Sequence, residues 1–146
     1  MKLRDFISLA CVLLPCVISS CNKIYRGDQL STKELEQIRK LGLLDANEKI
    51  YQLYSNHQGI KGAGNFYTTK RIANYWLHRG NKQTSFAYYQ DIAHINLTTH
   101  PPGDFTIPFV TVTRNDSTQF KVYIDGSGSE VKDFFLSCRN HWKSGR

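Results

Sequence analysis

Apolar and polar residues follow different spacings in successive parts of the chain. The first part is a nearly unbroken apolar run at positions 6–20, which follows Lys2 and Arg4. A basic start before a short apolar run is typical of a secretory signal. The run has 15 residues with Pro15 inside it, fewer than the roughly 20 that a membrane-spanning helix requires. Positions 1–20 are therefore predicted to be a cleaved signal peptide.

A helical spacing follows after position 30. Ser31 and Glu34 stand three residues apart and match a capping box. Five apolar residues continue the pattern: Leu35, Ile38, Leu41, Leu43 and Leu44. This pattern predicts a short helix that ends at Gly42. Positions 21–30 have no clear period and are interpreted as a tether, of which the last nine residues reach about 30 Å when fully extended.

From Glu48 onward, short runs of β-branched and aromatic residues alternate with turn residues, which is typical of strands. Seven strands are predicted, near positions 49–55, 65–71, 73–79, 84–89, 93–98, 105–113 and 118–124. The RNDS segment favours a tight hairpin that places Val112 near Phe120. Phe120, Val122 and Ile124 alternate with polar residues, so we expect one buried face on the last strand.

The chain closes with one amphipathic helix. Its apolar stripe recurs at helical spacing and consists of Val131, Phe134, Phe135, Cys138 and Trp142. Ser129 is the predicted N-cap, with Glu130 favourably placed in the first turn. Strands in series followed by one such helix predict a mainly β fold, in which the helix covers the open end of a strongly bent antiparallel sheet.

The end of the apolar run carries a more specific motif. Ile18, Ser19, Ser20 and Cys21 resemble the lipobox of bacterial lipoproteins. The resemblance implies cleavage before Cys21, a diacylglycerol on its thiol and acylation of the new amine. Two or three acyl chains make a stable membrane anchor. The alternative is an ordinary secreted protein that happens to have a cysteine near its mature start.

Processing at this site changes the cysteine count and the charge. Two of the four cysteines leave with the signal and one carries lipid, so Cys138 is left without a disulfide partner and is interpreted as a core residue. The remaining 126 of the 146 residues suit one domain, at positions 31–146 after the tether. The net charge falls from +7 to +6, which favours anionic lipid, cell-wall polymer or acidic partners. The exported location argues against nucleic acid as a partner.

The motif also predicts a location. We expect a lipid-anchored protein of the bacterial cell envelope. Asn22 and Lys23 follow the cysteine, with no Asp directly after it and no acidic run. This favours a periplasm-facing position in a cell with two membranes.

Several motifs beyond Leu44 occur in a recognisable order. They are Glu48-Lys49-Ile50, the segment GNFYTTKRI at 64–72, Tyr75-Trp76, and YYQDI at 88–92. Their order and spacing resemble the bacterial pleckstrin-homology-like (PH-like) and GRAM-like domains over about residues 44–143. The resemblance implies a bent seven-stranded antiparallel sheet, a partly open barrel, capped by a C-terminal helix at 130–142. It also implies a non-catalytic binding module, without fixing the ligand. Phosphoinositide-binding relatives carry a basic cluster in the first loop, where this chain has only His57 and Lys61.

The densest basic stretch lies at positions 70–82. The candidate ligand-binding residues in it are Lys70, Arg71, Trp76, Arg79 and Lys82. Neighbouring Lys and Arg residues with aromatic residues between them suit an anionic membrane surface. The alternative is a solvated strand face, since strand alternation directs Lys70 and Arg71 to opposite sides.

These observations lead to two functional hypotheses, with a small envelope enzyme kept as a third alternative that no motif supports. The first is a non-catalytic module that binds a protein or peptide partner through an exposed sheet edge or its loops. The second is direct binding of anionic lipid or cell-wall polymer by Lys70 to Lys82. We expect no enzyme, no cofactor and no metal site, because the five histidines lack HExxH spacing and no G-x-S-x-G motif is present. Asp91 is interpreted as structural rather than catalytic.

Overall fold

The computed structural model describes residues 23–56, 58–101 and 103–146. The predicted signal peptide and Cys21 lie outside these residues. The elements, in chain order, are β1 (Lys23–Arg26), the 3-10 turn η1 (Gly27–Gln29), α1 (Thr32–Lys40), β2 (Ile50–Ser55), β3 (Ala63–Thr68), β4 (Arg71–His78), β5 (Asn81–Tyr88), the 3-10 turn η2 (Tyr89–Asp91), β6 (Ile92–Thr98), β7 (Phe109–Arg114), β8 (Gln119–Tyr123) and α2 (Gly128–Ser144).

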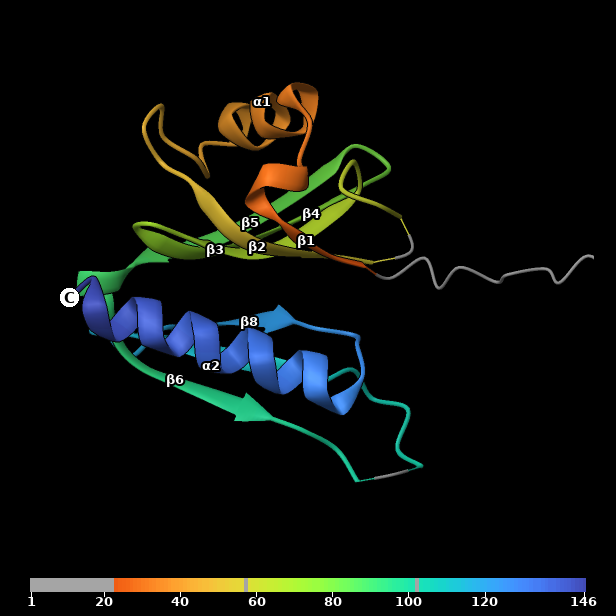
Figure 1. Cartoon of the computed structure of the whole chain (residues 1–146), viewed down its shortest axis with the longest axis vertical. Helices are drawn as coiled ribbons and strands as arrows, with labels where there is room; N and C mark the ends of the chain where they lie inside the picture. The colour runs from red at the N-terminus through yellow and green to blue at the C-terminus, as the bar shows by residue number, and fades with distance from the viewer. Residues whose placement is uncertain (1–22, 57, 102) are drawn as a thin grey trace, which may run out of the picture.

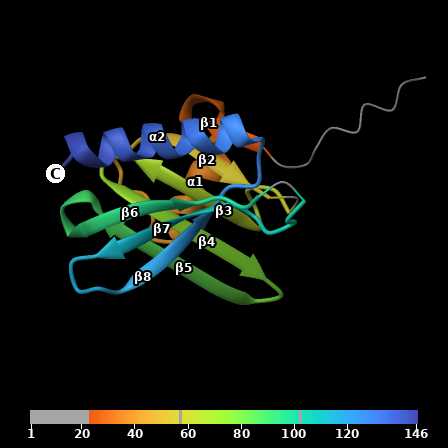
Figure 2. The same ribbon diagram turned by 90° about the horizontal axis from the view of Figure 1, so that it is seen from below.

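The strands form two antiparallel sheets, one of five strands in the order β1-β2-β3-β4-β5 and one of three in the order β6-β7-β8. Helix α1 covers the outer face of the larger sheet, and α2 runs along one side of both sheets (Figure 1). Strands β5 and β8 lie toward the side away from α2 (Figure 2). The mainly β prediction is confirmed, and the two sheets do not close into a barrel.

The larger sheet is buried on both faces. Strand alternation places Tyr67 in a core shared with the smaller sheet and α2, whereas its neighbour Phe66 lies in a second core under α1. Ile72 and Ala73 repeat this division on β4. The face toward the smaller sheet is the one that carries the candidate site below.

The described residues contain eight strands where seven were predicted. The additional strand is β1, which lies in the segment interpreted as a tether and pairs with β2 through Ile24 opposite Tyr54. The break between the second and third predicted strands was also misplaced, because the turn falls at Thr69-Lys70. The Thr68 hydroxyl accepts hydrogen bonds from the N–H groups of Lys70 and Arg71 and so closes this turn.

Two other strand predictions depended on turn chemistry. The tight hairpin between β7 and β8 is confirmed, with Val112 directly opposite Phe120. The predicted strand at 105–113 was too long, since β7 begins only at Phe109, after Pro108, which has no N–H to donate. The β4–β5 hairpin turns through Arg79 and Gly80, both with positive φ, at 46° and 82°.

The helix caps were predicted in part. The capping box of Ser31 and Glu34 at α1 is confirmed. At α2 the predicted cap Ser129 was wrong, because the N-cap is Ser127. Ser127 has Glu130 three residues later and so forms a reciprocal capping box, whereas Ser129 has Lys132 in that position.

The apolar stripe of α2 is confirmed as its buried face. Val131, Phe134, Cys138 and Trp142 are all buried, and Phe135 packs beside them. Within the described residues, neither helix combines the length and apolar character needed to span a membrane.

Candidate functional site

The structure separates the five candidate ligand-binding residues into two groups. Lys70 and Arg71 lie at the start of β4, next to the loop between α1 and β2. Trp76, Arg79 and Lys82 lie at the other end, on the β4–β5 hairpin, and all three are exposed. The basic stretch therefore does not form one continuous surface.

Arg71 is a buried internal residue with only 1% of its surface exposed. Its guanidinium donates to both carboxylate oxygens of Glu48, with Nε 3.0 Å from Oε1 and Nη2 2.7 Å from Oε2. Nη2 also lies 2.8 Å from Oδ1 of Asp45. Phe86 and Tyr88 place their rings against the same guanidinium. With both partners anionic, the Arg71 charge is satisfied inside the fold.

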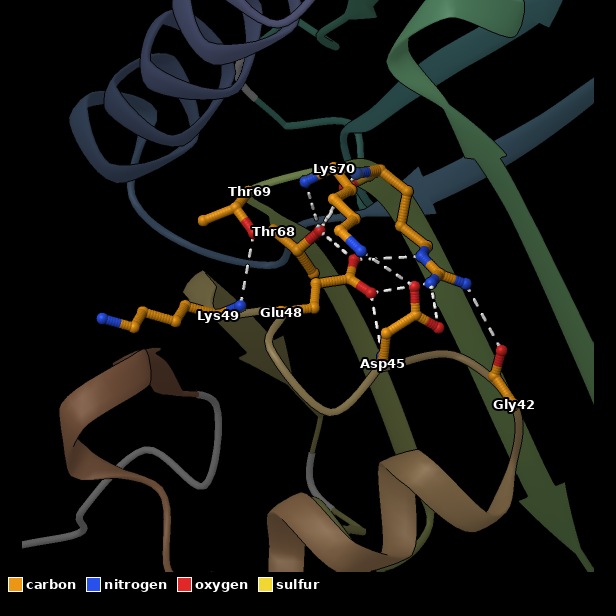
Figure 3. A network of polar contacts seen from close by, with 8 residues as sticks. Gly42, Asp45, Glu48, Lys49, Thr68, Thr69 and Lys70 are labelled. Carbon is orange, nitrogen blue, oxygen red and sulfur yellow. Dashed lines mark hydrogen bonds and ion pairs between the residues drawn. The ribbon is translucent and has the colours of Figure 1, made fainter.

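Lys70 belongs to the same network, which Figure 3 shows from close by. Its Nζ lies 3.2 Å from Oδ2 of Asp45. Hydrogen bonds from Arg71, and then from Lys70, lower the pKa of Asp45. The network ties the loop between α1 and β2 to the β3–β4 turn, and this is a structural role.

The largest opening near the remaining candidates is a cleft of about 700 Å³ between the β4–β5 hairpin and β8. This volume falls in the range of roughly 300–1,000 Å³ that is usual for small-ligand sites. We call it the amide cleft, because five of its lining residues carry side-chain amides: Asn56, Asn65, Asn74, Gln83 and Gln119. The other lining residues are Tyr54, Tyr75, Trp76, Ser85, Ile107, Phe120, Lys121 and Tyr123.

The cleft exists because the inner face of the larger sheet changes character along its strands. Near α2 this face is apolar, with Ile72 opposite Ala87. Two residues further along β4, on the same face, Asn74 stands between Asn65 on β3 and Ser85 on β5. This cross-strand polar row replaces the apolar core at the point where the larger sheet meets the edge strand β8.

The two asparagines of the row hold the neighbouring edge strand β8. Oδ1 of Asn65 accepts a hydrogen bond from the N–H of Tyr123 at 3.0 Å. Nδ2 of Asn74 donates to the carbonyl oxygen of Lys121 at 2.6 Å. Both partners are main-chain groups on the outer side of β8, so the amides occupy positions that another strand would otherwise fill.

Strand β5 forms the open edge of the larger sheet. Its hairpin closes with the pair His78 and Asn81, so the main-chain groups of Lys82, Thr84 and Phe86 point away from β4. Arg114 covers the last of these, donating to the Phe86 carbonyl from Nη2 at 2.9 Å. In the described part of the chain, no other element hydrogen-bonds to the main chain of Lys82 or Thr84, and both residues are exposed.

The sequence prediction selected basic residues and missed the amides. Asn65 and Asn74 occupy strand positions where asparagine is disfavoured, and this is the signal that was available. Trp76 is the one predicted residue that lines the cleft.

Among the described residues, no group of three His, Cys, Asp or Glu side chains is arranged to hold a metal ion.

Comparisons with known proteins do not assign a family to this chain. No model of a known protein family matches the chain, and no match is found among curated proteins or solved structures.

Proposed function

We propose that the chain is a lipid-anchored lipoprotein of the bacterial envelope whose PH-like domain is a non-catalytic binding module for a protein or peptide partner. The order of elements supports this proposal. Four antiparallel strands, β2 to β5, are followed by three more, β6 to β8, and then by α2. The PH-like resemblance implies seven antiparallel strands followed by a helix; here these strands are divided between two sheets, with β1 and α1 added before them.

The observation that carries the proposal is the open edge of β5 between Lys82 and Phe86. An extended peptide adds to such an edge through main-chain hydrogen bonds. On the nearest alternative edge, β8, the Lys121 carbonyl and the Tyr123 N–H are already bonded to Asn74 and Asn65. These observations favour β5 as the edge for the partner, beside a groove of about 440 Å³ that Thr84, Phe86 and Tyr88 help to line.

Charge indicates the kind of peptide. Arg79 and Lys82 stand exposed at one end of this edge, and Arg114 lies at the other. Cationic side chains at both ends favour an extended segment that contains acidic residues. Direct binding of anionic lipid or cell-wall polymer through Lys70 to Lys82 has less support, because Arg71 is buried and Lys70 is paired with Asp45.

A site-specific crosslinking experiment in intact cells tests the edge. A photoreactive residue at Lys82 should trap a defined partner, whereas one at Lys132, exposed on α2, should not. Thr84→Pro removes an outward N–H without removing a bond to β4, so it should abolish the crosslink. Thr84→Ala is the matched control and should retain it. Crosslinks of equal strength from both positions, or their survival in Thr84→Pro, would contradict the proposal.

The anchor has a separate test. Mass spectrometry of the mature N-terminus should find Cys21 as the first residue, with a diacylglyceryl group on sulfur and an acylated amine. An unmodified Cys21 would overturn the membrane attachment while leaving the β5 edge proposal standing.

A further inference from the structure

We infer that the amide cleft is a second binding site, and that its ligand is an uncharged saccharide chain. This inference goes beyond the peptide edge, because the inward-facing side chains of Trp76 and Gln83 line the cleft from the opposite face of the hairpin to that of Thr84 and Phe86.

Aromatic rings are exposed at the cleft. Trp76 is 40% exposed and Tyr123 is 42% exposed, although both line a concave site. An aromatic ring offers an apolar face, and Trp and Tyr also carry a polar edge that prefers contact with polar groups. The C–H faces of a sugar ring are apolar while its rim of hydroxyls is polar, so a saccharide matches such rings on both counts.

The asparagine pair presents an unused hydrogen-bond donor next to an unused acceptor. Asn65 uses Oδ1 to hold Tyr123, and the two N–H groups of its amide have no partner among the described residues. Asn74 uses Nδ2 to hold Lys121, and its Oδ1 likewise has no partner there. The two residues stand directly opposite each other on β3 and β4. A hydroxyl group both donates and accepts, so it can bond with the two amides at once.

The low charge of the lining disfavours strongly anionic and strongly basic ligands. Lys121 is the only residue with a formal charge among the described residues that line the cleft. Its Nζ lies 4.1 Å from the centre of the Phe109 ring, outside the lining, where the cation is already stabilised. An anionic headgroup or phosphate would therefore meet a single cation rather than a cluster, and a basic ligand would find no carboxylate in the lining.

A peptide strand is the remaining competitor, and the main chain disfavours it. Strand addition in the cleft would need the outer groups of β8 at Lys121 and Tyr123. Asn74 already occupies the carbonyl oxygen of Lys121, and Asn65 occupies the N–H of Tyr123. A neutral ligand that bonds through hydroxyls does not need them.

The test uses the full mature lipoprotein in a detergent without a sugar headgroup. The probes are three uncharged oligosaccharides, tri-N-acetylchitotriose, cellotriose and maltotriose, each titrated by calorimetry to about 10 mM, since sites of this kind are expected in the millimolar range. We expect saturable binding of at least one probe. Trp76→Ala and Asn65→Ala should each weaken it by about tenfold.

Two controls separate loss of binding from loss of fold. Tyr123→Ala removes an exposed ring, and His94→Ala alters an exposed residue of β6 that does not line the cleft. The first should weaken binding and the second should not. Thr84→Pro should leave saccharide binding unchanged, so failure of the peptide edge is distinguishable from failure of the cleft. No saturable binding of any of the three probes, or undiminished binding in both Trp76→Ala and Asn65→Ala, would overturn the inference.

Discussion

Arg71 and Glu48, which are 23 residues apart in the sequence, form a buried two-point ion pair at distances of 2.7 Å and 3.0 Å. Glu48 lies near the end of the loop that leads from α1 into the larger sheet, and Arg71 begins β4. The pair therefore fixes the position of that loop against the sheet. It also makes Arg71, one residue of the basic stretch, part of the interior.

The pair gives the first prediction. Arg71→Met leaves the Glu48 carboxylate buried without its cation, and we expect the free energy of unfolding to fall by about 3–5 kcal/mol. The double variant Arg71→Met/Glu48→Leu removes both charges and should recover most of the loss. Urea unfolding monitored by circular dichroism measures both. A double variant as unstable as the single one would show that the pair itself, rather than the unpaired charge, carries the stability.

The N-cap of α2 gives a second prediction: replacing either of two nearby serines should have different effects on the free energy of unfolding. Ser127→Ala removes the acceptor for the Glu130 N–H and should cost about 1 kcal/mol. Ser129→Ala, inside the first turn, should change the free energy of unfolding by less than about 0.5 kcal/mol. Thermal unfolding of the two variants in parallel measures the difference. A larger loss for Ser129→Ala would restore the cap predicted from the sequence.

The same cap predicts a pH dependence. Hydrogen bonds from the main-chain N–H of Ser127, and then from its side chain, lower the pKa of Glu130. A carboxyl group whose pKa is lower in the folded state contributes stability above its unfolded pKa, and that contribution is lost as the pH falls through the folded value. We therefore expect stability to decline below about pH 4.5. The urea midpoint, measured between pH 3 and pH 7, should therefore fall less steeply at low pH in Glu130→Gln than in the unmodified protein.

Gly64 lies where β3 passes the ring of Tyr75. A Cβ at this position would stand 2.5 Å from a ring carbon of Tyr75, whose hydroxyl is fixed by a 2.5 Å hydrogen bond to the Ile60 carbonyl. Gly64→Ala should therefore lower the free energy of unfolding by about 1–3 kcal/mol. Gly128→Ala has open space around it and begins a helix, so it should be neutral or stabilising. Chemical denaturation of both variants checks the contrast.

Cys138 is buried in the stripe of α2, and burial raises the pKa of its thiol. The native thiol should therefore react with iodoacetamide far more slowly than an exposed cysteine, because the thiolate is the nucleophile. If Cys21 carries lipid on its sulfur, the mature protein should show no reactive thiol when folded and one when unfolded in urea. Two thiols in the unfolded protein would contradict the lipid modification, and rapid labelling of the native protein would contradict the burial.

The strands of the core were predictable because their pattern is local. Val112 and Phe120 were placed opposite each other from one turn motif, and the alternation around Phe120 identified the buried face of β8. Strand β1 was missed because it has only four residues, and strand pairing with β2 rather than alternation establishes it.

The candidate site was less predictable, since it depends on contacts between distant segments. Arg71 was grouped with its basic neighbours because its partner Glu48 lies in another part of the sequence. The amide cleft joins Asn65 and Asn74 with residues of β8 some fifty positions later. Asparagine in a strand was the available signal, but only the fold shows which backbone each amide holds.

The early start of β1 changes the expected placement of the domain on a bilayer. β1 begins at Lys23, so with lipid on Cys21 only Asn22 separates the acylated residue from the sheet. Two residues reach at most about 7 Å, compared with the roughly 30 Å of a nine-residue extended tether. The β1 edge would then rest close to the headgroups, which limits how far the domain can tilt or rotate. β5 lies four strand spacings from β1, about 19 Å across the sheet, so of the larger sheet's two edges the one proposed to receive the peptide is the farther from the lipid.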